Sequence, residues 1–339
     1  MVVLLGLALI LSLGLALLPG CGSDGAEAFP YGLPQVHFPE DEGAHPASPV
    51  EWWYGNFSLT DSEGREYGAM VAYFRPPLKI ISITDLEAQT FHHEVFALDE
   101  DYAEGGLDLR WGDSDRWFRP DPDSPSYDLE AAATDIALDL NIVSRKPPLT
   151  VGGDGLIEWV EGNSYYYSLT RLDVEGSIKL PERSIDVTGI GWMDHQWMDA
   201  LSEGGWDWFS VQLDDNTDLI FWQVVNADES VESRDMTIMF ADNSIFHTEA
   251  LELESSDSWV SSETGYEYGT VWRVREETLG IDLEIAARHA EQEILMSAAI
   301  PGSDWAFWEG RMSVSGQMDG KDVSGTGYAE LVRFPSSGE

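Results

Sequence analysis

The alternation of apolar and polar residues with a period of two is the feature that most constrains the fold of this chain. Residues 135–142 and 279–286 follow it without interruption. In an extended strand, successive side chains point to opposite faces, so this pattern predicts strands with one buried face. Further runs with strand character are Trp52–Leu59, Ala69–Phe74, Phe91–Leu98, Tyr165–Leu172, Leu219–Val225, Met236–Phe240, Val271–Val274, Met312–Met318 and Gly327–Phe334.

Turn residues separate these runs, and long helical periodicity is absent from the sequence. Asp319-Gly320, for example, is a strong hairpin signal. Many strands with short turns indicate a sandwich or closed barrels. Each half of the 339 residues carries enough strands for a barrel of roughly eight, a size that holds one small ligand. We therefore predict an all-β protein with two antiparallel β-barrel domains packed together, at residues 46–198 and 199–339.

The first 21 residues have the pattern of an export signal. Val2 to Leu18 is uncharged and almost wholly apolar, and Leu18-Pro19-Gly20-Cys21 follows. A small residue before the chain's one cysteine resembles a bacterial lipobox. We predict a lipoprotein signal at 1–21 with lipidation at Cys21, a linker and leading loop at 22–45, and an exported protein held to the cell envelope membrane by its lipid. A plain signal peptide or an uncleaved anchor are the alternatives.

The charge of the chain is strongly acidic. Asp and Glu number 62 against 18 Lys and Arg, which gives a formal net charge of −44. Such a field repels nucleic acid and anionic membrane surfaces. The acids are spread along the whole sequence, which favours a solvated shell of the halophilic or marine kind. Bound calcium is the competing explanation, but no Asp-x-Asp-x-Asp-Gly loop is present.

The clearest candidate site is the segment from Gly189 to Trp197, which places Asp194 and His195 side by side between tryptophans. Charged groups enclosed by aromatic residues have perturbed pKa values and cluster at functional sites. Strand geometry separates the pair, because His195 shares a face with Trp197 and Asp194 shares the other with Trp192. We expect His195 and Trp197 to face the pocket and Asp194 to support the domain junction.

Other motifs give weaker signals. Glu51 beside Trp53 is either an acid of raised pKa or a surface carboxylate. His92 and His93 are adjacent in a strand and point to opposite faces, so we expect no metal there. Serine-hydrolase, phosphate-loop and dinucleotide motifs are absent from the sequence, and no cofactor is expected.

Taken in order, these motifs resemble the AttH / carotenoid 1,2-hydratase family. The matching segments cover nearly everything after about residue 45: Glu51-Trp52-Trp53-Tyr54, Phe74-Arg75, Tyr165-Tyr166-Tyr167-Ser168, Gly191-Trp192-Met193-Asp194-His195-Gln196-Trp197, Gly205-Trp206-Asp207-Trp208-Phe209, Trp259-Val260-Ser261-Ser262, Phe307-Trp308-Glu309-Gly310 and Gly325-Thr326-Gly327-Tyr328-Ala329-Glu330-Leu331.

The resemblance implies two lipocalin-like β-barrel domains. Some members of the family add water to an isoprenoid double bond without a cofactor, and the AttH branch is exported and associated with an ABC-transporter system. The hydratase branch uses a His-x-Trp pair, which His195 and Trp197 match, and a Tyr-x-Asp pair on the following strand. Here that strand reads Phe221-Trp222-Gln223-Val224, which has no carboxylate.

Two functional hypotheses therefore remain open. In the first, the protein binds a hydrophobic, isoprenoid or lipid-like molecule in a barrel pocket. In the second, it is a cofactor-independent hydratase or hydrolase with His195 as base. The candidate catalytic residues are His195, Asp194, Asp207 and Glu51, and the candidate pocket residues are Trp53, Trp192, Trp197, Trp206, Trp208, Tyr166 and Trp222.

Overall fold

The computed structural model describes residues 31–75, 77–97, 100–159, 162–200, 204–226 and 230–334. The predicted signal segment, Cys21 and the first part of the predicted linker lie outside the described residues. No helix in the described part of the chain is long and apolar enough to span a membrane.

The first sheet has 13 strands, all antiparallel to their neighbours, in the order β4-β3-β2-β1-β13-β12-β9-β8-β7-β6-β5, with β10 and β11 paired to β12. Its strands are β1 (Val50–Asp61), β2 (Glu66–Arg75), β3 (Leu78–Asp85), β4 (Thr90–Phe96), β5 (Glu100–Tyr102), β6 (Asp108–Trp111), β7 (Asp115–Phe118), β8 (Ser126–Ala132), β9 (Ala137–Ser144), β10 (Leu149–Thr150), β11 (Leu156–Trp159), β12 (Gly162–Leu180) and β13 (Arg183–Met198). A 3₁₀ turn, η1 (Glu40–Glu42), precedes β1.

The second sheet has 10 strands in the order β17-β16-β15-β14-β23-β22-β20-β19-β18, with β21 paired to β22. Its strands are β14 (Gly205–Leu213), β15 (Asp218–Val225), β16 (Val231–Met239), β17 (Ile245–Thr248), β18 (Glu252–Val260), β19 (Glu267–Glu276), β20 (Ile281–Ala287), β21 (Glu293–Leu295), β22 (Ala306–Met318) and β23 (Lys321–Arg333). A second 3₁₀ turn, η2 (Met296–Ala298), follows β21.

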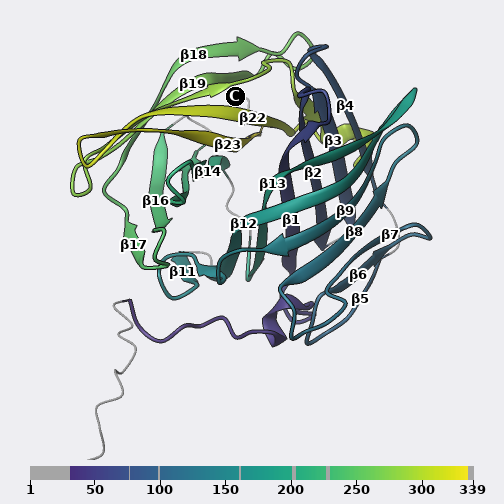
Figure 1. Ribbon diagram of the computed structural model, residues 1–339, viewed down its shortest axis with the longest axis horizontal. Coiled ribbons are helices and arrows are strands. Elements are labelled where there is room, and N and C mark those ends of the chain that lie inside the picture. Colours follow the sequence, from purple (N-terminus) through teal and green to yellow (C-terminus); the bar gives the residue numbers. More distant parts are fainter. Residues whose placement is uncertain are drawn as a thin grey trace, which may run out of the picture.

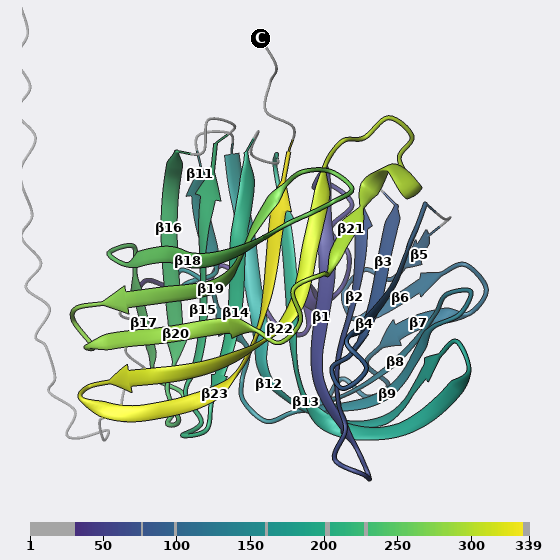
Figure 2. The same cartoon turned by 90° about the horizontal axis from the view of Figure 1, so that it is seen from above.

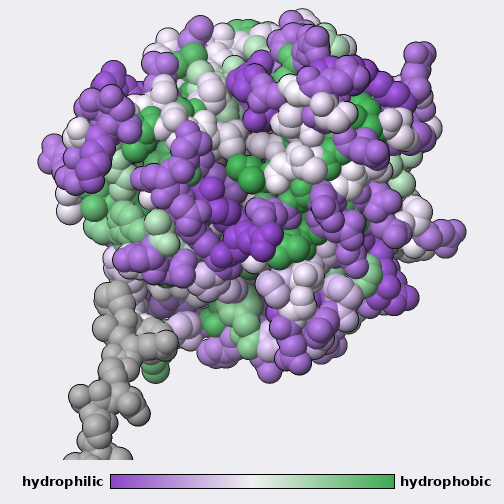
Figure 3. All heavy atoms as spheres, viewed as in Figure 1, coloured by the Kyte–Doolittle hydropathy of each residue, from purple (hydrophilic) through white to green (hydrophobic). Residues whose placement is uncertain are grey.

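Each sheet curls strongly, and the two curled sheets lie side by side (Figures 1 and 2). The expected fold class is confirmed as two antiparallel half-barrels with almost no helix. The first sheet ends with Met198 and the second begins with Gly205. The visible face in Figure 3 is mostly hydrophilic, as the acidic composition leads one to expect.

Three apolar clusters hold this arrangement together. One fills the curl of the first sheet, one fills the curl of the second, and the third contains residues of both sheets. Polar contacts cross the same junction, since buried Asp218 on β15 forms ion pairs with Lys146 at 2.8 Å and with Arg171 at 2.5 Å. The junction is therefore a packed core as well as a boundary, and β13 borders it.

Candidate functional site

Strand β13 serves two different cores with its two faces. Trp192 packs in the cluster between the sheets, and Met193 and Trp197 pack in the core of the first sheet. His195 is fully buried beside Trp197, with their ring centroids 4.9 Å apart. Asp194 and His195 therefore lie on opposite faces of one strand, as the alternation predicts.

Asp194 lies at the centre of a hydrogen-bond network between the sheets. It accepts hydrogen bonds from the Tyr166 hydroxyl at 2.5 Å, from Ser168 Oγ at 2.6 Å and from Trp192 Nε1 at 2.6 Å. Trp208 of the second sheet extends the network by donating from Nε1 to the Tyr166 hydroxyl at 3.0 Å. Burial raises the pKa of Asp194 to about 7 even though these donors lower it.

A cavity opens beside Asp194 at the junction of the sheets. The cavity and the open solvent at its mouth together amount to about 870 Å³. Its lining residues come from both sheets and are mostly aromatic: Trp52, Tyr54, Phe74, Tyr166, Asp194, Gln196, Met198, Ala200, Trp206, Trp208, Trp222, Val224 and Glu330. A concave apolar site with a few convergent polar groups is the usual form of a small-molecule pocket.

A second carboxyl centre reaches this cavity from the second sheet. Glu309 on β22 and Glu330 on β23 are directly opposed across the two strands, and Glu330 lines the cavity. Tyr54 donates to Glu309 Oε2 at 3.0 Å, and Trp206 Nε1 donates to Glu330 Oε1 at 2.5 Å. Burial raises the pKa of Glu309 well above its ordinary value, and the neighbouring charge and hydrogen bond of Glu330 raise it further. Burial also raises the pKa of Glu330, although its hydrogen bonds with Glu309 and Trp206 lower it. Both shifts favour the protonated form of the pair.

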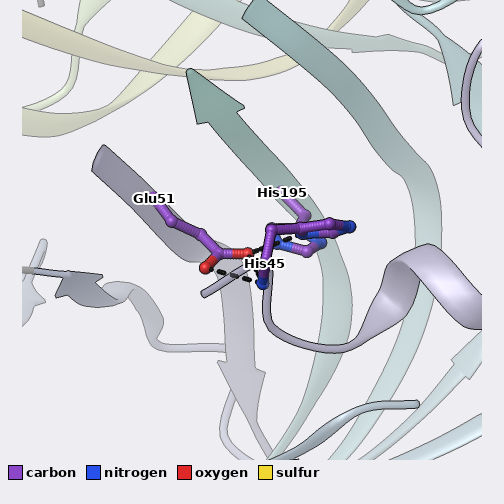
Figure 4. Close-up of side chains that lie close together, drawn as sticks. All are labelled: His45, Glu51 and His195. Carbon is purple, nitrogen blue, oxygen red and sulfur yellow. Dashed lines mark hydrogen bonds and ion pairs between the residues drawn. The ribbon is translucent and has the colours of Figure 1, made fainter. Parts of the chain in front are cut away.

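The opposite face of β13 holds a second cluster. Glu51 on β1, His45 in the preceding loop and His195 bring their polar atoms together (Figure 4). Glu51 Oε1 lies 2.8 Å from His45 Nδ1 and 3.0 Å from His195 Nε2. Arg75 Nη1 donates to Glu51 Oε2 at 2.6 Å. Glu51 is thus neither a surface carboxylate nor an acid of raised pKa.

The pKa values of this cluster shift in the opposite direction from those at the cavity. Burial alone would raise the pKa of Glu51, but hydrogen bonds from His195 and His45 and the charge of His195 lower it to about 2. Burial lowers the pKa of His195 by more than its contact with Glu51 raises it. Glu51 is therefore ionised at neutral pH.

The structure divides the sequence-predicted site residues between these two faces. Tyr166, Trp206, Trp208 and Trp222 line the cavity, and Trp192 donates to Asp194 behind it. Trp53 and Trp197 pack with His195 in the core of the first sheet. The expectation that His195 and Trp197 face the pocket does not hold for this cavity, because Asp194 occupies the strand face that borders it.

Asp207 lies outside both groups. Its carboxylate accepts hydrogen bonds from Arg333 at 2.7 Å and from Gln223 at 2.8 Å. It does not appear among the described residues that line the cavity, because Trp206 and Trp208 on either side of it take the cavity face.

Sequence reasoning missed Glu309, Glu330, Tyr54 and His45 as candidate site residues. A signal existed for the glutamates, since each interrupts an apolar strand segment, Phe307-Trp308-Glu309-Gly310 and Tyr328-Ala329-Glu330-Leu331. Buried glutamates are uncommon unless they are paired. His45 lies in a loop without periodicity, so no pattern could place it beside β1 and β13.

The fold and the cavity define a class: a lipocalin-like β protein of two curled sheets with an aromatic site between them. The model of the AttH-like family matches residues 31–333, and the chain belongs to that family.

Similar proteins share this architecture over most of their length. Kievitone hydratase of Fusarium solani subsp. phaseoli is 22% identical over 296 residues, which are 83% of this chain and 81% of that protein. The crystal structure of an AttH protein from Nitrosomonas europaea has a TM-score of 0.77 at 24% identity, covering 87% of this chain and 96% of that one. Kievitone hydratase from Nectria haematococca has a TM-score of 0.72 at 17% identity, covering 89% and 94%. At these identities the structural likenesses establish the fold.

Proposed function

We propose that this protein is a cofactor-independent hydratase that adds water to an isolated carbon–carbon double bond of a hydrophobic substrate in the cavity between the sheets. The observation that carries the proposal is the composition of the cavity wall. Carboxyl groups enter from both sheets, Asp194 from β13 and Glu330 from β23, and the wall around them is largely aromatic.

The Glu309–Glu330 pair is the proton donor in this proposal. Protonating an alkene requires a neutral acid in an apolar site. Two opposed, buried carboxyls without a cation partner among the described residues cannot both ionise readily. Glu330 borders the cavity, so it delivers the proton, and Glu309 behind it shares the charge that remains.

The aromatic wall and Asp194 complete the reaction. The alkene π electrons take the proton, a C–H bond forms, and the neighbouring carbon becomes a carbocation that the indole and phenol faces stabilise. Water then forms the C–O bond, and Asp194 accepts the proton that the water loses. A carboxylate offers about four acceptor positions, and three are used by Tyr166, Ser168 and Trp192. The remaining position is free to orient the water. The proton then returns from Asp194 to the Glu309–Glu330 pair through solvent in the cavity that Asp194 and Glu330 both line, and the sum is alkene plus water giving an alcohol.

The relatives support this chemistry at a coarser level. Two of the similar proteins are kievitone hydratases, one matched by sequence and one by structure. The base is where this proposal differs from the expectation drawn from the sequence. Asp194 replaces His195 in that role, because His195 lies on the far face of β13.

Binding without turnover is the competing function, and one observation favours it. All three donors to Asp194 belong to the protein, so its carboxylate is already well satisfied. A group held in this way can serve simply to fix the cavity wall. The cavity would then hold a hydrophobic molecule unchanged.

One experiment separates the two functions. Kievitone and simpler isoprenoid alkenes are incubated with the protein in ¹⁸O-labelled water, and the products are analysed by mass spectrometry. Hydration gives a product heavier by one labelled water, and the Glu330→Gln and Asp194→Asn variants lose it while Asp207→Asn keeps it. Binding of these compounds without any labelled product would overturn the hydratase proposal for this substrate class and support the binding function.

The predicted place of action is part of the proposal. We propose that the protein works outside the cytoplasm, attached through lipid on Cys21, with an ABC-transporter system as a candidate partner from the family resemblance. Mass spectrometry of the protein from its native membrane would show a diacylated N-terminal cysteine. An unmodified chain that still starts at Met1 would contradict this location.

A further inference from the structure

Three potential metal-ligand atoms converge on the face of β13 that turns away from the cavity. They are Nδ1 of His45, Oε1 of Glu51 and Nε2 of His195, and all lie within 4.8 Å of one another (Figure 4). The oxygen lies 2.8 Å from the first nitrogen and 3.0 Å from the second. Tetrahedral zinc with bonds of about 2.0–2.1 Å separates its ligand atoms by about 3.3 Å. The two oxygen–nitrogen pairs would therefore have to widen by about half an ångström or less to hold a tetrahedral ion.

We propose that His45, Glu51 and His195 form a binding site for a divalent transition-metal ion, with zinc as the best fit. Two imidazoles and one carboxylate are a ligand set that zinc accepts, and the fourth position is then open to water. The site is separate from the proposed hydratase chemistry, because it lies in the core of the first sheet on the other side of β13.

The groups around the cluster are arranged as the outer partners of a metal site. Arg75 holds Glu51 Oε2 at 2.6 Å and thereby directs Oε1 toward the histidines. Asp41 Oδ1 lies 3.4 Å from His45 Nε2. The ring of His45 stacks on Trp197 with centroids 3.8 Å apart, and His195 stacks on Trp53 at 4.5 Å. Such partners fix the orientation and tautomer of ligating histidines.

An ion can reach the cluster from the side of His45. The side chains of Glu51 and His195 are fully buried, whereas His45 is 20% exposed and Asp41 is 22% exposed. Asp41 also adds a negative charge at the exposed end. His45 belongs to the loop before β1, so this ligand can move aside without disturbing the sheet.

The test is isothermal titration calorimetry with zinc chloride and the full folded chain. Excess magnesium chloride is present so that the many surface carboxylates are occupied. We expect one zinc ion per chain, and at least tenfold weaker binding for His45→Gln and for Glu51→Gln. Cobalt(II) should give the visible absorption bands of a tetrahedral ion in the wild type and lose them in His45→Gln.

His247→Gln is the matched control. His247 Nε2 contacts Asp235 at 2.6 Å, so it is also a histidine–carboxylate pair, but no third ligand joins it in the described residues. We expect its affinity for zinc to equal that of the wild type. His45 is partly exposed and lies in a loop, so His45→Gln can be measured even if a change at the buried Glu51 or His195 prevents folding. Absence of saturable one-to-one binding, or equal binding by the wild type and His45→Gln, would overturn the metal site.

Discussion

The two faces of β13 each bury a carboxylate, and the two carboxylates behave in opposite ways. Glu51 is 0% exposed and Asp194 is 2% exposed, yet the pKa of Glu51 is about 2 and that of Asp194 is about 7. Arg75 and two imidazoles surround Glu51. Asp194 receives three neutral donors, and no basic side chain of the described residues pairs with it. Burial disfavours the charged form of both carboxylates, and the neighbouring charges decide whether the pKa rises or falls.

This contrast explains why Asp194 and His195, which are adjacent in the sequence, belong to different sites. On the Glu51 face, basic side chains balance the carboxylate, so this face suits a group that stays ionised for structure or for a metal ion. On the cavity face, the carboxyls have no basic partner among the described residues, so this face favours protonated carboxyls in an apolar cavity. Replacing a basic partner of Glu51, or a carboxyl group on the cavity face, should remove this difference between the two faces.

The largest effect on stability should come from Arg75→Met. This change leaves the fully buried Glu51 without its guanidinium partner. Breaking a buried ion pair on one side costs about 3–5 kcal/mol. Urea denaturation at constant salt should show a loss of that size in the free energy of unfolding.

Arg145→Met is the control for that measurement. Arg145 pairs with Asp173 at 2.6 Å, but both side chains are about half exposed, at 55% and 50%. Exposed pairs contribute about 0–1 kcal/mol. Equal losses for the two variants would mean that Glu51 does not depend on Arg75.

On the cavity face, Glu330→Gln should reduce hydration by about 100-fold or more, since an amide cannot act as general acid. The folded state should tolerate the change, because a glutamine can still accept the Trp206 hydrogen bond. Turnover of the isoprenoid alkene, measured together with substrate binding, checks this. Full turnover in the variant would exclude Glu330 as the donor.

The strand pattern predicted the fold class and the split of Asp194 from His195. Both follow from local periodicity, because alternate residues of a strand face opposite ways. The motif around Asp194 was found because Asp194 and His195 stand side by side between tryptophans in the sequence.

Which face of β13 borders a cavity could not be predicted, because that depends on the second sheet. Tyr54, Glu309 and Glu330 lie on β1, β22 and β23, and they meet only through packing between the sheets. The same holds for His45, which a loop brings against Trp197. A single sequence gives no register between distant strands.

The pH dependence of stability should also differ between the faces, and Glu309→Gln tests the cavity side. The pKa of Glu309 is raised in the folded state by burial and by Glu330. Below its ordinary value of 4.5 the side chain is protonated in both states, so its contribution to stability is fully present. As pH rises, the unfolded chain releases the proton while the folded protein keeps it, and stability falls. Each unit of pKa difference corresponds to about 1.4 kcal/mol.

Glu309→Gln removes this loss because the amide does not titrate. We expect the stability of the wild type to fall relative to that of the variant between about pH 4 and about pH 8. Urea denaturation at both pH values checks the slope. If the stability of the wild type relative to the variant does not fall as pH rises, Glu309 does not hold a proton in the folded protein.

The smallest expected effect compares two tyrosines that donate to buried carboxylates. Tyr166 donates to Asp194 at 2.5 Å and Tyr127 donates to Glu42 at 2.8 Å, and each tyrosine is 4% exposed. Glu42 also has Arg119 at 2.7 Å, whereas Asp194 depends on neutral donors. Tyr166→Phe, which also removes the acceptor of Trp208 Nε1, should therefore destabilise the fold by about 1 kcal/mol more than Tyr127→Phe. If urea denaturation shows equal losses for the two variants, then Arg119 does not make Glu42 less dependent on the hydroxyl of Tyr127.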